Sequence, residues 1–264
     1  MSAALLQTVE LSKSFPLGGG PFSSSPRKRI DAVRNITIGL QAGESVGLVG
    51  ESGCGKSTLA KLMCRLIEPT SGSVLFDGKS IAEQLGRQLA VFRRSVQMVF
   101  QDPQSSLNPL LRIGDAVAEP MAIHGIACGR ELRARTEKLL SEVGLDPALA
   151  RRRPDALSGG ERQRVGIARA LGLNPKILIC DEPVSSLDLP MQAQILKLLA
   201  DLQTNRGLTL FFISHNLATI SVIADRILVM RAGEILEEGP NPRLFIAPQH
   251  PYTQQLVKLA SKTI

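Results

Sequence analysis

The sequence predicts an α/β protein whose core is a mainly parallel β-sheet, with a helical segment inserted between its strands. Three observations support this fold class. Short apolar runs alternate with segments of helical period, which favours parallel strands joined by right-handed crossovers. Between residues 102 and 154 the helical period continues without a strand-like run. Only 3% of the residues are aromatic, so the core is mainly aliphatic, as in buried parallel strands covered by helices.

The first half of the chain contains a strand, a glycine-rich loop and a helix in immediate succession. Residues 33–40 alternate between apolar and polar side chains in the manner of a strand. Residues 45–50 form a short apolar strand, and 57–67 have apolar residues at helical spacing. Further strands are predicted at 72–78 and at 95–102, where the chain leaves the core at Gln101.

The second half returns to alternating helices and strands. We predict helices at 160–171 and 191–203 and after residue 215, and strands at 176–181, 208–214 and 226–230. Residues 16–26 are rich in Gly, Pro and Ser and predict a flexible loop between early strands. The sequence shows no internal repeat.

Composition limits the functional classes. The 264 residues carry a net charge of +7, but the basic runs at 27–29 and 151–153 contain no aromatic residues, so stacking on single-stranded nucleic acid has no support. No apolar run approaches the roughly 18 residues that span a bilayer, and the first residues do not resemble a signal peptide. We therefore expect a soluble, cytoplasmic protein. The four cysteines form no CxxC pair, so we expect reduced, structural thiols.

The loop at residues 50–58, GESGCGKST, predicts a nucleotide-binding site. Its pattern of Gly50, four residues, Gly55, Lys56 and Ser57 matches the Walker A motif, in which backbone N–H groups surround phosphate oxygens at a helix N-terminus. Lys56 is expected to reach the β- and γ-phosphates, and the Ser57 hydroxyl to bind Mg²⁺. Kinases, GTPases and many ATPases share this loop, so it does not separate these classes.

Later motifs separate them. Residues 157–164, LSGGERQR, resemble the signature motif of ABC ATPases, and the run 176–182, KILICDE, resembles their Walker B strand. Asp181 is then expected to hold Mg²⁺, and Glu182 to orient and deprotonate the attacking water. The family usually has Gln where this chain has Glu161. A carboxylate there costs affinity only if it faces the triphosphate.

The resemblance to ABC ATPases extends over nearly the whole chain and implies further roles. Gln101 matches the Q-loop residue that reaches Mg²⁺ and the water, and Asp188 lies in the D-loop. His215 matches the switch histidine at the γ-phosphate, although Asn216 replaces the usual Asp. Phe15 is the candidate for stacking on adenine, with Phe22 as its rival. The implied ATP-binding set is Phe15, Gly50, Glu51, Ser52, Gly53, Cys54, Gly55, Lys56, Ser57, Thr58, Ser158, Gly159, Gly160 and Asp188.

Two stretches narrow the branch of the family. QDPQSSLNP at 101–109 and PQHPYTQQLV at 248–257 look like segments of the ATPases of oligopeptide, dipeptide and nickel importers. GESGCGKST at 50–58 together with SSLNP at 105–109 looks more like the second ATPase of such an operon than the first. Many relatives continue beyond this tail into a cysteine-containing extension that the present sequence, which runs to Ile264, does not show, so we expect no iron–sulfur or metal site of that kind. The HPYT sequence also suits a helix start with Pro in the first turn.

The resemblance implies an ABC cassette with an N-terminal antiparallel β region. The ATPase domain is expected at 1–246, with its helical subdomain at 102–154, and a C-terminal tail at 247–264. Two cassettes would face each other head to tail, so one expected partner is a second ATPase subunit, either a different chain or a second copy of this one. The resemblance to importers also implies two membrane permeases and, indirectly, a solute-binding protein. No nucleic-acid partner is expected. The chain would lie peripherally on the cytoplasmic face of the bacterial inner membrane.

The function that follows is uptake of peptides driven by hydrolysis of Mg-ATP. A nickel or metal-chelate importer is the alternative, and an ABC ATPase without a membrane partner is a further one. Translation factors of that class carry two cassettes in one chain, and repair ATPases insert a long coiled coil, neither of which this sequence has. Export is disfavoured by the tail and by the absence of fused membrane helices.

Overall fold

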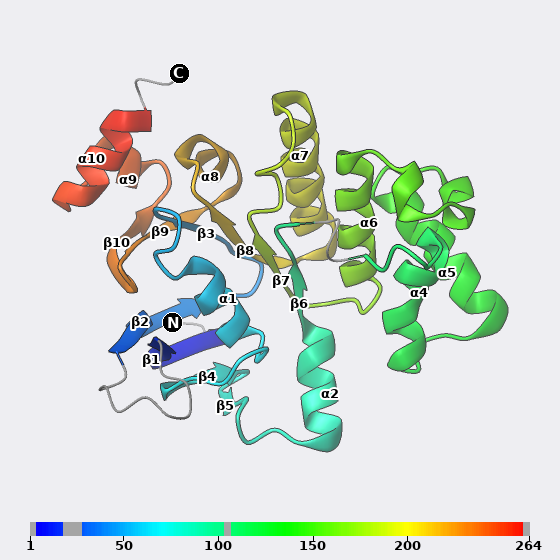
Figure 1. Cartoon of the computed structure of the whole chain (residues 1–264), viewed down its shortest axis with the longest axis horizontal. Coiled ribbons are helices and arrows are strands. Elements are labelled where there is room, and N and C mark those ends of the chain that lie inside the picture. Colours follow the sequence, from blue (N-terminus) through cyan, green and yellow to red (C-terminus); the bar gives the residue numbers. More distant parts are fainter. Residues whose placement is uncertain (1–3, 18–27, 103–106, 261–264) are drawn as a thin grey trace. The chain divides into compact units, whose positions relative to one another are not determined.

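The computed structural model describes residues 4–17, 28–102 and 107–260 of the chain (Figure 1). The chain forms two compact units. The first contains Met1–Gln41, Val46–Gln84 and His215–Ile264, and the second contains Ala42–Ser45 and Leu85–Ser214. Within the described part of the chain, no helix is both long enough and apolar enough to cross a bilayer.

An antiparallel sheet of four strands in the order β2-β1-β4-β5 begins the first unit. Strands β1 (Leu6–Leu17) and β2 (Lys28–Leu40) form a long pair, and β4 (Ser71–Phe76) pairs with β1 on its other side. The short β5 (Lys79–Ser80) completes the sheet. The prediction of a loop at 16–26 was wrong for Pro16 and Leu17, which belong to β1, and its other residues lie outside the described ranges.

The remaining strands of the first unit hold the phosphate loop. Strand β3 (Ser45–Val49) is buried along its whole length and pairs in parallel with β9 (Arg226–Arg231), as expected for a central apolar strand. Strand β10 (Glu234–Pro240) pairs antiparallel with β9 and was not predicted. The helices of this unit are α1 (Lys56–Met63), α8 (Leu217–Ile223), α9 (Arg243–Ile246) and α10 (Pro251–Ala260).

The second unit contains three parallel strands in the order β8-β7-β6. Strands β7 (Ile177–Asp181) and β8 (Thr209–Ser214) are buried at every residue, which explains their unbroken apolar sequences. Strand β6 (Val96–Val99) pairs with β7. Helix α2 (Gly86–Ser95), which was not predicted from the sequence, leads into β6.

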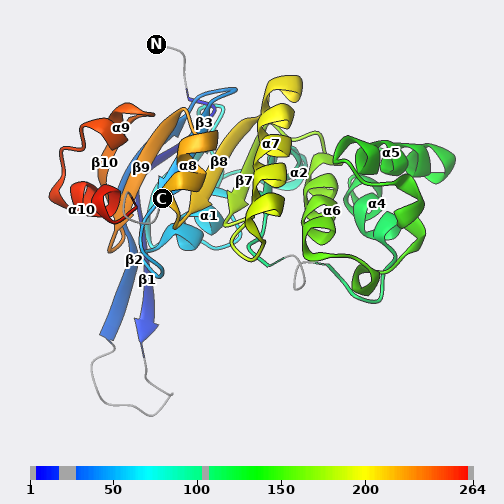
Figure 2. The same ribbon diagram turned by 90° about the horizontal axis from the view of Figure 1, so that it is seen from above.

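The other regular elements in the described part of the second unit are helices, and Figure 2 shows α4, α5 and α6 packed together. They are α4 (Ile113–Ile123), α5 (Gly129–Glu142) and α6 (Gly159–Leu171), with the 3₁₀ turns η1 (Pro147–Arg151) and η2 (Pro154–Ala156) before α6. Helix α7 (Leu189–Arg206) follows β7. The predicted fold class is thus confirmed: parallel core strands, an antiparallel N-terminal region and helices inserted after β6.

Candidate functional site: an ATP-binding cassette

The phosphate loop is shaped by close contacts that only glycine allows. A Cβ atom at Gly50 would lie 2.1 Å from the carbonyl oxygen of Met230, and one at Gly55 would lie 2.0 Å from that of Ala32. Gly55 also has a φ of 112° and is the N-cap residue of α1, in the left-handed region that glycine enters most readily. The loop therefore passes directly beside β9 and β2, which explains its glycines in steric terms.

Lys56 folds back onto the loop that precedes it. Its side chain is 4% exposed, and its ammonium donates to the carbonyl oxygens of Gly50 at 2.8 Å and Glu51 at 2.9 Å. The positive charge thus lies at the N-terminus of α1, where the helix dipole and the N–H groups of the first turn also attract anions. This arrangement fits a phosphate group.

Cys54 completes the interior of the loop as a neutral thiol. Burial raises its pKa, although the Lys56 ammonium acts in the opposite direction. Its carbonyl accepts the N–H of Gly233 at 2.9 Å, which ties the loop to the turn between β9 and β10. All four cysteines lie within the described residues and are free thiols. Burial, and then the Asp181 carboxylate, raises the pKa of Cys180.

Phe15 and His215 are the other predicted residues of the first unit. Phe15, on β1, is 40% exposed, and the Lys13 ammonium lies 5.2 Å from the centre of its ring. Its rival Phe22 lies outside the described residues. His215 is exposed directly before α8, and Asn216 caps that helix by accepting the N–H of Ala218 at 2.9 Å. The Asn in place of the usual Asp therefore has a structural use.

In the second unit, the carboxyl end of β7 carries Asp181 and Glu182. Asp181 is 4% exposed, whereas the Glu182 side chain is partly exposed. The Nε2 atom of Gln101 lies 3.3 Å from the Oε2 atom of Glu182, so the structure brings the predicted Q-loop residue and the predicted base together. An amide that donates to this carboxylate helps to fix its orientation.

The backbone of Glu182 is unusual. Its φ is 46°, which is uncommon for a residue with a side chain and is often found at functional sites. Its N–H donates to the carbonyl of Ile213 at 3.0 Å, and its own carbonyl accepts from the N–H and the hydroxyl of Ser185. The surrounding hydrogen bonds therefore hold the strained conformation.

The signature segment begins α6 with a capping box. The Ser158 hydroxyl accepts the Glu161 N–H at 3.3 Å and donates to the Glu161 carboxylate at 2.8 Å. The same carboxylate accepts the Ser158 N–H at 2.8 Å, and these hydrogen bonds lower the pKa of Glu161. The S-x-x-E spacing is a known capping signal. The unusual Glu161 is thus explained locally, as the closing residue of this cap.

The signature glycines pack against the segment that carries the D-loop. A Cβ at Gly160 would lie 1.9 Å from the Met191 methyl carbon, and one at Gly159 would lie 3.4 Å from Leu187. Asp188 caps α7 by accepting the N–H of Met191 at 2.9 Å. The structure therefore brings the signature and the D-loop of one chain side by side. No group of three or more His, Cys, Asp or Glu side chains among the described residues is arranged to hold a metal ion.

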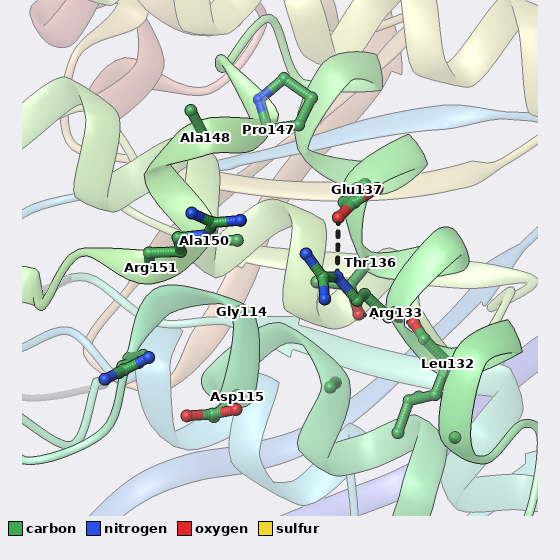
Figure 3. A pocket seen from close by; sticks show the side chains of 13 residues that line it. Gly114, Asp115, Leu132, Arg133, Thr136, Glu137, Pro147, Ala148, Ala150 and Arg151 are labelled. Carbon is green, nitrogen blue, oxygen red and sulfur yellow. Dashed lines mark hydrogen bonds and ion pairs between the residues drawn. The ribbon is translucent and has the colours of Figure 1, made fainter.

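A separate pocket lies among α4, α5 and η1, with a volume of 730 Å³ (Figure 3). Figure 3 shows Arg133 joined to Glu137, and the pair meets at 3.1 Å. Arg151, from a basic run noted in the sequence, also lines it. None of the predicted nucleotide-binding residues does, so this pocket is not the candidate ATP site.

The phosphate loop, the acidic end of β7 and the signature segment define an ATP-binding cassette, and comparison with known proteins identifies the family. The chain belongs to the ABC transporter family, whose model matches residues 33–185, and it is an ATPase of that family. It is 48% identical over 260 residues to a probable peptide ABC transporter ATP-binding protein, y4tS, from Sinorhizobium fredii, covering 98% of this chain and 73% of that protein. The resemblance to the ATPases of peptide importers is confirmed.

Other similar proteins are also components of transporters. The glutathione import ATP-binding protein GsiA of Pectobacterium atrosepticum is 45% identical over 253 residues, and the chain spans only 40% of its length. The dimeric ATP-binding cassette MJ0796, solved with ADP and Pi, superposes with a TM-score of 0.78 at 31% identity, covering 89% of this chain and 98% of that one. CbiO1 of Clostridium perfringens, part of the transporter complex cbiONQ, gives 0.76 at 27% identity, covering 99% of both.

Proposed function

We propose that this chain is the ATP-hydrolysing subunit of an ABC importer for small peptides. The cargo class is supported by the relatives, of which one is a probable peptide transporter protein and another a glutathione importer protein. Glutathione is itself a tripeptide, so both cargoes share peptide chemistry. The observation that carries the catalytic part of the proposal is the Gln101 amide at 3.3 Å from the Glu182 carboxylate, on a backbone fixed by hydrogen bonds.

The proposed roles follow from the chemistry of each group. The N–H groups of residues 50–58 and the Lys56 ammonium bind the phosphates of ATP, and Phe15 stacks on adenine. Glu182 accepts a proton from the attacking water, which Gln101 and His215 help to orient. Ser57, Asp181 and Gln101 are the residues that would hold Mg²⁺, which neutralises charge on the phosphate oxygens when bound.

The chain is proposed to act as one half of a pair. In the dimer, Ser158, Gly159 and Gly160 of one cassette face the ATP held by the phosphate loop of the other, with Asp188 near the interface. We propose a second ATPase subunit, two permeases and a solute-binding protein as partners. The cassette would lie on the cytoplasmic face of the membrane. The helices at 102–154 would form the subdomain that meets the permeases, and 247–264 a C-terminal tail.

Replacing the proposed base tests the catalytic assignment. In Glu182→Gln, assembled with its partners, we expect ATP hydrolysis to fall on the order of 10²-fold or more with nucleotide binding retained, because the amide cannot accept the proton. Glu83→Gln, an exposed carboxylate on another segment, is the control and should hydrolyse ATP normally. Turnover of the Glu182 variant close to that of the control would reject the assignment.

Uptake measurements test the cargo. Vesicles that contain the whole transporter and its binding protein should accumulate a labelled dipeptide or glutathione when supplied with ATP, and should fail to do so with the Glu182→Gln chain. Accumulation of Ni²⁺ without peptide would contradict the peptide proposal while leaving the ATPase assignment intact.

A further inference from the structure

The ring of Phe15 lies against an anchored cation. The Lys13 ammonium lies over this ring, 5.2 Å from its centre. The same ammonium donates a hydrogen bond to the carbonyl oxygen of Glu68 at 2.6 Å. A cation within about 6 Å of a ring centre is attracted to the negative face of the ring. Lys13 therefore occupies one face of Phe15, and its hydrogen bond to Glu68 holds it there.

The end of β1 that carries this ring is joined to the segment that follows α1. The N–H of Thr70 donates to the carbonyl of Ser12 at 2.8 Å, and the Thr70 hydroxyl accepts the N–H of Ser14 at 3.0 Å. Together with the bond to Glu68, these contacts join β1 to residues 68–70. Because α1 begins at the phosphate loop, the ring is anchored close in sequence to the helix that follows this loop.

Part of the Phe15 ring remains open to a ligand. Its side chain is 40% exposed, and Ile30, its partner in the register of β1 and β2, is 51% exposed. Side chains opposite each other in an antiparallel pair are neighbours, so two exposed apolar groups lie side by side. Aromatic rings stack through their faces. With the ammonium over one face, a base stacks on the other.

We propose that Lys13 is a positioning residue for the adenine base, which it serves by holding the Phe15 ring in the orientation that stacks. The inference rests on the proposed function of Phe15 in binding adenine. A ring that is oriented before ATP arrives loses less side-chain freedom on binding. The ammonium also draws the electrons of the ring toward its own face, so the opposite face repels the electron-rich purine less. Lys13 thus acts on the ring and not on the phosphates.

Removing the charge of Lys13 tests this role. In Lys13→Met the dissociation constant for Mg-ATP should rise about 2- to 5-fold, the size of a cation–π contact at an exposed site. The dissociation constant for inorganic triphosphate, which has no base, should stay the same. Lys13→Arg keeps a cation over the ring and should restore most of the ATP affinity. Lys79→Met is the matched control, because Lys79 is an exposed lysine on β5 of the same sheet.

A double-mutant cycle tests whether Lys13 acts through the ring. In a chain that already carries Phe15→Leu, the further change Lys13→Met should leave ATP affinity unchanged, because the ring on which the ammonium acts is gone. The measurement is isothermal titration calorimetry of the full chain with Mg-ATP and with Mg-triphosphate. Melting curves show whether each variant is folded.

Weaker ATP binding that is confined to chains with Phe15, together with unchanged triphosphate binding, supports the proposal. An equal loss of triphosphate affinity in Lys13→Met overturns it, since attraction of the phosphates or loosening of β1 would then account for the effect. Unchanged or tighter ATP binding by Lys13→Met also overturns it, and tighter binding would show that the ammonium covers the stacking face. Normal ATP binding by Phe15→Leu rejects the proposed function of Phe15 and the inference with it.

Discussion

Substituting Gly50 tests whether the shape of the phosphate loop depends on its contact with β9. In Gly50→Ala the new Cβ atom would lie 2.1 Å from the Met230 carbonyl oxygen and 2.8 Å from the Cys54 sulfur. Real Cβ atoms essentially never approach another atom within 3.0 Å, so the loop or the strand must move by about 0.9 Å. The carbonyl belongs to a strand that is hydrogen-bonded on both sides, so we expect the loop to move.

The magnitude follows from two general relations. Overfilling a packed site costs about 1–3 kcal/mol of folding free energy. A displacement of about 1 Å in groups that position a substrate can reduce activity about 10²-fold. Gly50→Ala should therefore lower stability moderately and weaken ATP binding at least about 10-fold.

A second glycine supplies the control. Gly78, in the turn between β4 and β5, has a φ of 74°, and no atom lies within 4 Å of the position that a Cβ would occupy there. Gly78→Ala should cost about 1–2 kcal/mol through its left-handed backbone alone, without touching the phosphate loop. The assay combines urea unfolding with ATP titration for both variants. If Gly50→Ala bound ATP as well as Gly78→Ala, the steric account of the loop would be refuted.

Two further predictions concern carboxylates with lowered pKa values. Glu161→Gln keeps the capping box but removes a negative charge beside the Ser158 hydroxyl, so the assembled transporter should show a KM for ATP about 2- to 5-fold lower. Glu161→Ala also loses the cap, so this variant should instead unfold at a lower temperature. Identical kinetics in the two variants would contradict the argument. Burial acts to raise the pKa of Glu237, but hydrogen bonds from Gln249, Thr253 and His250 together lower it below its usual 4.5. The contribution of Glu237 to stability is therefore complete above about pH 4.5 and is lost as the pH falls through the lowered pKa. Unfolding curves from pH 7 to pH 3 should therefore show the wild type losing stability relative to Glu237→Gln on acidification, and a constant difference would argue against the linkage.

Local patterns predicted much of this fold because each had a local cause. The apolar runs at β3, β7 and β8 are buried strands, and Lys56 begins a helix directly after the glycines. Strand β10 was missed because it alternates weakly, with glutamates at 234, 237 and 238. Helix α2 was missed although Phe92 is buried, because its other residues are mostly polar.

The candidate site was predictable where a motif carries its own chemistry, and less so where distant segments meet. Ser158 and Glu161 have the spacing of a capping box, so the sequence carries a local signal for their hydrogen bonds, although Glu161 was interpreted only as a departure from the family's Gln. The contact between the Tyr252 ring and the Arg231 guanidinium was not predictable, because it depends on how the start of α10 is hydrogen-bonded to Glu237 of β10. The positive φ of Glu182 could not be predicted either, since no residue type in its segment indicates a left-handed backbone.

The fixed backbone of Glu182 has a consequence for how its chemistry can be studied. Its N–H and carbonyl are bound to Ile213 and Ser185 whatever the side chain is. These bonds fix the Glu182 backbone independently of its carboxylate. Shortening or neutralising the side chain therefore leaves the backbone in place. Substitutions at this position can therefore vary reach with Asp, or charge with Gln, one property at a time, within an otherwise unchanged turn.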